Sequence, residues 1–308
     1  MRWPTASLST PGACLALLLL ASSAAFCSDA PGQYDVPRKT AQLPNGMTLG
    51  YIELGDSQNP PLIYLHGYTN SGRGYLPLGR LLAREHHVFL LDQRGHGASG
   101  KPECCYSRID FAYDIKLFLD QLGIERADIA GHSLGSIVAQ TFAAYWPERT
   151  RRLVLIATTA GQRSNSKPRK PQSTSTFGAA TDAAIANLKD PIDPDSAFMR
   201  EWWSIPGVDP ELLAIVRRES AAIPASVWRA MLQQLGSSID LRYTIGSIKA
   251  PTLLLFGGKD TLFGAKDRRE LAAFLPTAKI ALFPRLGHSL PEQDPATVAA
   301  SIQEFLSQ

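Results

Sequence analysis

The chain has 308 residues, of which 44% are hydrophobic and 19% are charged. This composition is ordinary for a globular protein with a buried core, and it excludes a disordered or collagen-like chain. The formal net charge is only +3, and prolines interrupt the densest basic stretch, which holds Lys167, Arg169 and Lys170; without a basic face, no nucleic-acid partner is expected.

The N-terminal segment has the order of a secretory signal peptide. One positive residue, Arg2, precedes the apolar run Ala13–Ala21, and small residues follow in Ser22–Ala25. The run of 9 residues is far shorter than the roughly 20 that a membrane-spanning helix needs. We therefore expect export rather than membrane insertion.

Cleavage is expected between Ala25 and Ser28, so residues 1–28 form the predicted signal peptide. A lipoprotein signal would use Cys27 as the lipidated residue, but Phe26 occupies the preceding position, where such a signal has a small residue. The sequence thus predicts no stable membrane anchor. Bacterial export to the periplasm, or else secretion, fits the segment best.

A parallel sheet covered by helices is predicted for most of the mature chain. Pro44-Asn45-Gly46 separates two extended runs and predicts an opening hairpin. After it, short apolar strands alternate with longer amphipathic helices, which is typical of an α/β fold with helices on both faces of a mostly parallel sheet. The expected strands are Thr40–Leu43, Met47–Glu53, Leu62–Leu65, Val88–Leu91, Ala127–Ala130, Leu153–Ile156, Thr252–Phe256 and Lys279–Phe283.

The alternation stops between residues 162 and 247, where the sequence predicts a helical cap inserted into the sheet domain. The sheet domain itself is expected to comprise residues 29–161 and 248–308. Helix-like segments in the predicted cap are Thr181–Leu188, Asp195–Trp203, Pro210–Ala221 and Ser226–Gly236.

A candidate nucleophile lies in the motif Gly131-His132-Ser133-Leu134-Gly135, between a predicted strand and a predicted helix. A serine on such a sharp turn exposes its hydroxyl, and glycines remove side chains that would clash there. The N-terminus of the following helix also offers unpaired N–H groups to developing negative charge.

Ser133 needs a base and an acid that orients the base. On a strand-to-helix elbow of this kind the acid and then the histidine follow the serine in the chain. His288 is the only histidine downstream. Asp260 follows the strand Thr252–Phe256, at the sheet edge where such sites lie, and is preferred to Asp267, which is expected on the next helix.

The oxyanion hole is expected to combine the backbone N–H groups of Leu134 and Tyr68. Tyr68 lies in the loop His66-Gly67-Tyr68-Thr69, directly after the strand Leu62–Leu65. His66 precedes the serine and is interpreted as a structural turn residue.

These residues resemble those of the α/β-hydrolase superfamily. The resemblance rests on His66-Gly67, the turn Asp92–Ser99, the Ser133 motif, Gly258-Lys259-Asp260 and Gly287-His288. Within the superfamily the chain looks most like the capped esterases, lactonases and C–C hydrolases. Related epoxide hydrolases and haloalkane dehalogenases have an aspartate where Ser133 stands. The resemblance implies that the Asp92–Ser99 turn is structural, and Ser136 departs from a glycine common among relatives.

The cap contains three tryptophans, Trp202, Trp203 and Trp228. They are candidates for an apolar acyl pocket, but they could equally form the cap's own core. Two adjacent cysteines, Cys104 and Cys105, could be free thiols or a strained bridge, and a bridge from Cys27 would require that cleavage spare it.

We therefore predict an exported serine hydrolase that cleaves a small to medium, largely apolar carboxylic ester or lactone through an acyl-enzyme. The same triad also fits a C–C bond hydrolase, a proline-releasing aminopeptidase or an acyltransferase. A non-catalytic ligand-binding protein on this fold is the alternative from another class. No metal-ligand motif or dinucleotide fingerprint is present, so the sequence predicts no metal and no cofactor.

Overall fold

The computed structural model describes residues 32–160, 177–236 and 241–308. The predicted signal peptide, residues 1–28, and the first part of the predicted cap, residues 162–176, lie outside the described residues. The helices and strands below belong to the unit Gln33–Gln308.

A single sheet organises the described residues, with the strand order β1-β2-β4-β3-β5-β6-β7-β8. The first hairpin is antiparallel, β2 pairs antiparallel with β4, and all remaining pairs are parallel. The predicted α/β class and the opening hairpin are thereby confirmed. The strands are β1 Lys39–Gln42, β2 Thr48–Leu54, β3 Pro61–Leu65, β4 His87–Leu91, β5 Ala127–His132, β6 Thr150–Ile156, β7 Thr252–Gly257 and β8 Lys279–Phe283.

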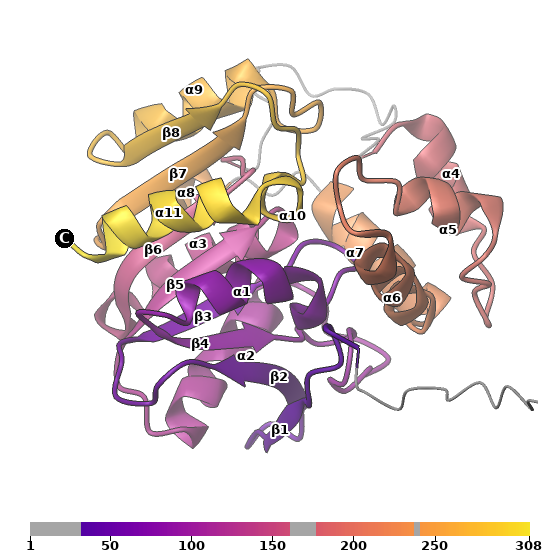
Figure 1. The fold of residues 1–308 in the computed structure, drawn as a ribbon, viewed down its shortest axis with the longest axis horizontal. Coiled ribbons are helices and arrows are strands. Elements are labelled where there is room, and N and C mark those ends of the chain that lie inside the picture. The colour runs from indigo at the N-terminus through magenta and orange to yellow at the C-terminus, as the bar shows by residue number, and fades with distance from the viewer. Residues whose placement is uncertain (1–31, 161–176, 237–240) are drawn as a thin grey trace, which may run out of the picture. The chain divides into compact units, whose positions relative to one another are not determined.

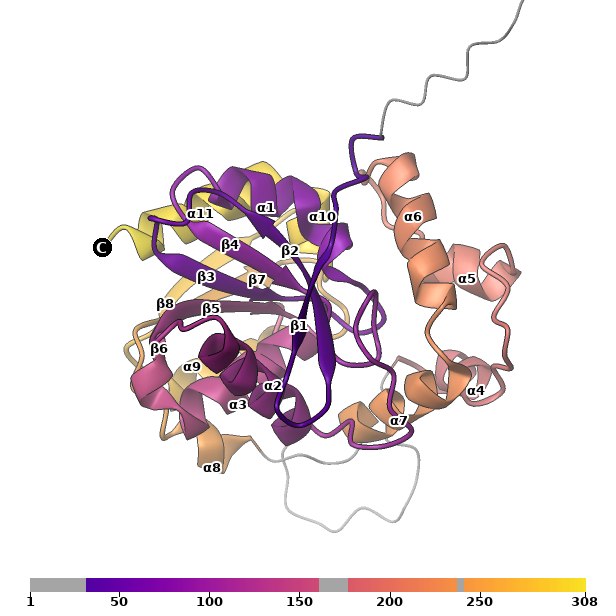
Figure 2. The ribbon, with the colours of Figure 1, turned by 90° about the horizontal axis from the view of Figure 1, so that it is seen from below.

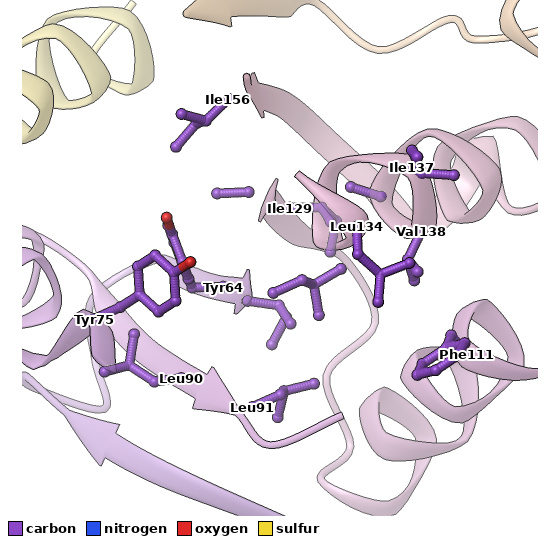
Figure 3. Packing of buried hydrophobic residues seen from close by; sticks show 14 of the residues in the cluster. Tyr64, Tyr75, Leu90, Leu91, Phe111, Ile129, Leu134, Ile137, Val138 and Ile156 are labelled. Atoms are coloured by element: carbon purple, nitrogen blue, oxygen red, sulfur yellow. The ribbon is translucent and has the colours of Figure 1, made fainter. Parts of the chain in front are cut away.

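Helices cover both faces of this sheet (Figure 2). On one face α1 (Leu76–Leu82) packs against α11 (Pro295–Leu306). The other face carries α2 (Arg108–Gln121), α3 (Leu134–Tyr145) and α9 (Ala265–Phe274). Because both faces are covered, every residue of β5 is buried, which explains its lack of polar alternation. Figure 3 shows apolar side chains of the central strands packed against those of α3.

Four helices of the predicted cap lie between β6 and β7 in the chain and beside the sheet in Figure 1. The next short helix, α8 (Arg242–Ile245), contacts α3 rather than continuing the cap bundle. The four cap helices are α4 Ala179–Ala186, α5 Ala197–Trp202, α6 Pro210–Ala221 and α7 Ala225–Gly236.

One partly buried carboxylate, that of Glu219, joins the predicted cap to the sheet domain. Glu219 of α6 accepts hydrogen bonds from Arg38 Nη1 at 2.8 Å and from Arg73 Nε at 3.0 Å. Its second oxygen accepts from Arg38 Nη2 at 2.6 Å and from Ser71 Oγ at 2.5 Å. Arg38 also pairs with Asp92 at 2.7 Å, so this group connects α6 to the turn after β4.

Cys104 and Cys105 form a disulfide between adjacent residues, which is the bridge that the sequence left open; Cys27 lies outside the described residues. Across the described ranges, no helix combines the length and the apolar character needed to cross a bilayer.

Candidate active site

The candidate nucleophile, Ser133, occupies the turn between β5 and α3. Its backbone has φ 52° and ψ −116°, an unusual conformation for a residue with a side chain. The turn is tight because a Cβ on Gly131 would overlap the backbone of Gly135, and one on Gly135 would overlap the carbonyl oxygen of Leu65. The two motif glycines therefore allow the strand and helix to approach closely enough to present Ser133.

The candidate base and acid are hydrogen-bonded to each other. His288 Nδ1 lies 3.0 Å from Asp260 Oδ2. The other carboxylate oxygen of Asp260 accepts from the backbone N–H groups of Leu262 at 2.8 Å and Phe263 at 3.0 Å. Burial favours a higher pKa for Asp260, but the hydrogen bond from His288 and these two amides lower its pKa overall. The site thus holds an ionised, oriented carboxylate behind the imidazole.

Strand order brings these groups to one edge of the sheet. Ser133 follows β5, Asp260 follows β7 and His288 follows β8, and these strands run parallel. The loop containing Tyr68 follows β3, the parallel neighbour of β5. All four loops consequently leave the carboxyl ends of their strands, where open α/β sheets place their sites.

The backbone N–H groups of Tyr68 and Leu134 differ from those of their neighbours at this edge. The N–H of Gly67 donates to the Tyr75 hydroxyl, and that of Ser133 donates to the Ile156 carbonyl. Within the described residues, no acceptor is found for the N–H groups of Tyr68 and Leu134. Unpaired amides at these two positions are suited to stabilise an oxyanion.

Cap side chains contact the oxyanion loop directly. Trp202 Nε1 donates to Thr69 Oγ1 at 2.9 Å, and the Tyr68 hydroxyl donates to the Trp228 carbonyl at 2.7 Å. The Tyr68 ring packs edge-on against both indoles, at 5.7 Å and 5.6 Å between ring centroids. Trp228 and Trp203 are buried, whereas Trp202 is partly exposed. Of the three tryptophans, Trp202 therefore retains accessible surface next to the loop.

His66, Asp92 and Asp267, which the sequence does not assign to the triad, have structural partners. His66 is fully buried; its Nε2 accepts from the Gln93 amide at 3.0 Å, and burial lowers its pKa to about 4. Asp92 accepts from the backbone amides of Gly72 and Ala98, both at 2.8 Å. Asp267 lies at the start of α9 and accepts from the Gly264 amide. In the part of the chain that the structure describes, no three His, Cys, Asp or Glu side chains cluster as around a metal ion.

Two polar residues around the site, His132 and Glu292, escaped the sequence reasoning. His132, the variable residue of the serine motif, lies between the Tyr75 hydroxyl at 2.7 Å and the His288 carbonyl at 2.8 Å. Glu292 lies in the short helix α10 (Leu290–Gln293) and accepts from Asn70 Nδ2 at 3.3 Å. Burial raises its pKa to about 7. In the sequence, these two residues could have been found only because His132 adjoins Ser133 and Glu292 lies close to His288.

Comparison with known proteins bears on the fold and on the class of protein. Residues 60–203 match a family model described as the alpha/beta hydrolase fold. The chain is 27% identical to a 2-hydroxy-6-oxo-6-phenylhexa-2,4-dienoate hydrolase of Burkholderia cepacia, over 79% of this chain and 86% of that protein. It is 25% identical to an sn-1-specific diacylglycerol lipase of Mus musculus, over 82% of this chain and 83% of that protein.

Solved structures share the fold over most of this chain. An enol-lactonase from Burkholderia xenovorans LB400 superposes with a TM-score of 0.72 at 20% identity, covering 88% of this chain and 100% of that chain. At this identity the likeness concerns the fold. The family match and the strand order together show the α/β-hydrolase fold, and the relatives that this chain resembles include a protein named as a hydrolase.

Proposed function

We propose that this chain of the α/β-hydrolase fold is an exported serine hydrolase that cleaves a small to medium, largely apolar carboxylic ester or lactone. The observation that carries the proposal is the 3.0 Å contact between His288 Nδ1 and Asp260 Oδ2, on the sheet edge that also presents Ser133. An imidazole held by a buried carboxylate has no evident use in a protein that only binds a ligand.

Each step of the reaction follows from these groups. Ser133 Oγ bonds to the substrate carbonyl carbon while its proton passes to His288 Nε2. The Leu134 and Tyr68 amides hold the resulting oxyanion. The bond from carbon to the leaving oxygen then breaks, and that oxygen takes the proton from His288. Water adds to the acyl-enzyme, gives its proton to His288, and the acid leaves as Ser133 recovers the proton.

The proposed apolar substrate is supported by the aromatic cap residues near the oxyanion loop. Phe177 stacks on the Tyr68 ring at 5.3 Å, and Phe198 stacks on Trp202 at 5.9 Å. Phe177, Phe198 and Trp202 are only partly buried. An acyl chain bound beside Tyr68 would therefore meet aromatic surface rather than charge.

A fluorophosphonate tests the nucleophile without a guess about substrate. Ser133 Oγ would bond to phosphorus, fluoride would leave, and His288 would take the proton. We expect one adduct per chain, mapped to Ser133 by peptide mass spectrometry, and none in Ser133→Ala or His288→Ala. No adduct in the folded wild-type protein would refute the proposal and favour a ligand-binding protein.

Substrate screening then separates the chemistries that share this triad. Turnover of p-nitrophenyl esters or simple lactones, lost in Ser133→Ala, supports the proposed class. The second candidate is C–C bond hydrolysis, favoured by the relative named as a 2-hydroxy-6-oxo-6-phenylhexa-2,4-dienoate hydrolase. Faster turnover of that dienoate would indicate a C–C hydrolase, and faster turnover of a peptide with an N-terminal proline would indicate a proline-releasing aminopeptidase. Faster acyl transfer to an acceptor other than water would indicate an acyltransferase. Each of these results would rule out the ester or lactone assignment.

Export is proposed from the N-terminal segment, residues 1–28. N-terminal sequencing of protein expressed with the full chain in a bacterial host should find a new terminus between Ala25 and Ser28, in the periplasm or medium. An intact N-terminus in the cytoplasm would contradict it.

A further inference from the structure

One buried hydroxyl, that of Tyr75, joins the loops that carry the proposed catalytic groups. It accepts from the Gly67 N–H at 3.2 Å and lies 2.7 Å from His132 Nδ1. The other imidazole nitrogen, Nε2, lies 2.8 Å from the His288 carbonyl oxygen. Gly67 is the residue before Tyr68, the proposed oxyanion donor, and His132 is the residue before Ser133, the proposed nucleophile. The Tyr75 hydroxyl therefore contacts the direct sequence neighbours of both.

The donor and acceptor in each of these hydrogen bonds can be assigned from the His288 carbonyl, which can only accept, and the Gly67 N–H, which can only donate. The His288 carbonyl can only accept, so His132 Nε2 must carry a hydrogen. Burial and the nearby His288 lower the pKa of His132 to about 3, so the imidazole is neutral and its Nδ1 is bare. Burial also raises the pKa of Tyr75 well above its ordinary value, so Tyr75 keeps its hydrogen. Tyr75 therefore donates to His132, which donates to His288, while Gly67 donates to Tyr75.

We propose that the Tyr75 hydroxyl is a positioning group for catalysis, which sets the placement of the oxyanion loop, the nucleophile turn and the histidine loop relative to one another. This inference rests on the proposed function, because it assigns Tyr75 a role in the reaction of Ser133 and His288. Tyr75 acts through Gly67 and His132 rather than by touching the substrate.

The chain provides a matched control in Tyr64. Tyr64 and Tyr75 lie next to each other (Figure 3). Their ring centroids are 4.8 Å apart, and the two residues are 0% and 1% exposed. They differ in their hydroxyls, because the Tyr64 hydroxyl has no hydrogen-bond partner among the residues that the structure describes. Replacing either tyrosine by phenylalanine removes one buried hydroxyl from the same part of the core. Only the replacement of Tyr75 also breaks the contacts with Gly67 and His132.

The experiment compares Tyr75→Phe and Tyr64→Phe with the wild type. The rate constant for labelling by a fluorescent fluorophosphonate and kcat on p-nitrophenyl butyrate are measured well below the melting temperature. For Tyr75→Phe we expect both to fall roughly ten- to hundredfold with KM little changed, since small misplacements of catalytic groups cost about that much. Tyr64→Phe should stay within about twofold of the wild type.

A second variant tests the route through His132. His132→Gln removes the imidazole bridge and leaves the Tyr75–Gly67 contact in place. Because the two residues act in one chain, the double variant with Tyr75→Phe should lose much less than the product of the two single losses. His132→Gln alone also provides the test if Tyr75→Phe does not fold.

The outcomes separate this inference from the proposed function. No labelling of the wild type and of Tyr64→Phe would refute the serine mechanism itself. Labelling of the wild type with Tyr75→Phe equal to Tyr64→Phe would overturn the positioning role. The positioning role would also be overturned if Tyr75→Phe lowered only the melting temperature and left kcat and the labelling rate unchanged. It would equally be overturned if the loss of kcat in the double variant equalled the product of the losses in Tyr75→Phe and His132→Gln.

Discussion

Replacing Asp260 by asparagine should reverse the proton arrangement of the candidate base while leaving the fold intact. In the structure Oδ1 of Asp260 accepts from the backbone amides of Leu262 and Phe263, and Oδ2 faces His288 Nδ1. Backbone amides can only donate, so the single oxygen of asparagine must take the Oδ1 position. Its NH2 group then faces Nδ1, which must accept. The imidazole hydrogen moves to Nε2, the nitrogen that should receive the Ser133 proton.

The expected loss is large because the base is present but in the wrong tautomer. The same error in a Ser-His-Asp protease lowers kcat about 10,000-fold, which corresponds to about 5.5 kcal/mol of transition-state stabilisation. We expect a loss of that order in kcat on p-nitrophenyl butyrate and a much smaller change in KM. The melting temperature should change little, since the asparagine keeps both backbone contacts.

Asp267→Asn is the matched control, because Asp267 is the nearest alternative acid in the chain. It accepts from the Gly264 amide at 3.0 Å and from Thr159 Oγ1 at 3.3 Å. This variant should retain kcat within about threefold. The reasoning is refuted if Asp260→Asn keeps more than about a tenth of the wild-type kcat, or if Asp267→Asn suffers the greater loss.

Two further predictions concern stability. Burial raises the pKa of Glu292 from 4.5 to about 7, so the folded state binds this proton more tightly than the unfolded chain, and stability falls as pH rises from about 4.5 to about 7. Glu292→Gln, neutral at every pH, should therefore gain in melting temperature relative to the wild type between pH 5 and pH 8; a constant difference would contradict this. Glu219→Gln weakens the charged contacts to Arg38 and Arg73 and should lower the free energy of unfolding in urea by about 2 kcal/mol. A change below about 0.5 kcal/mol would show that these contacts do not stabilise the fold.

The sheet could be predicted because its signal is local. Strand β5 is buried at every position, and its apolar run followed by a glycine-flanked serine indicates both the strand and the turn. The edge on which Ser133, Asp260 and His288 lie follows from the strand ends alone. Helix α10 was not predicted, because four residues are too few for a helical period to be visible.

The polar contacts between loops could not be predicted, since they join residues far apart in the chain. Tyr75 and His132 are separated by 57 positions, and Thr69 and Trp202 by 133. Nothing in the neighbourhood of either residue specifies such a partner, because side-chain contacts of this kind depend on strand order and on the angle at which the cap meets the sheet. The role of the cap tryptophans was open for the same reason.

The two contacts between the cap and the oxyanion loop differ in what they demand of the cap's sequence. Tyr68 donates to the main-chain carbonyl at position 228, which any amino acid there would supply. Trp202 donates through its indole to Thr69, so that contact depends on the side chain itself. A cap could be grafted from a relative to change substrate preference. Such a cap could carry a different amino acid at position 228, provided that the backbone carbonyl of residue 228 stays in place. It would have to preserve Trp202, or replace Trp202 and Thr69 together.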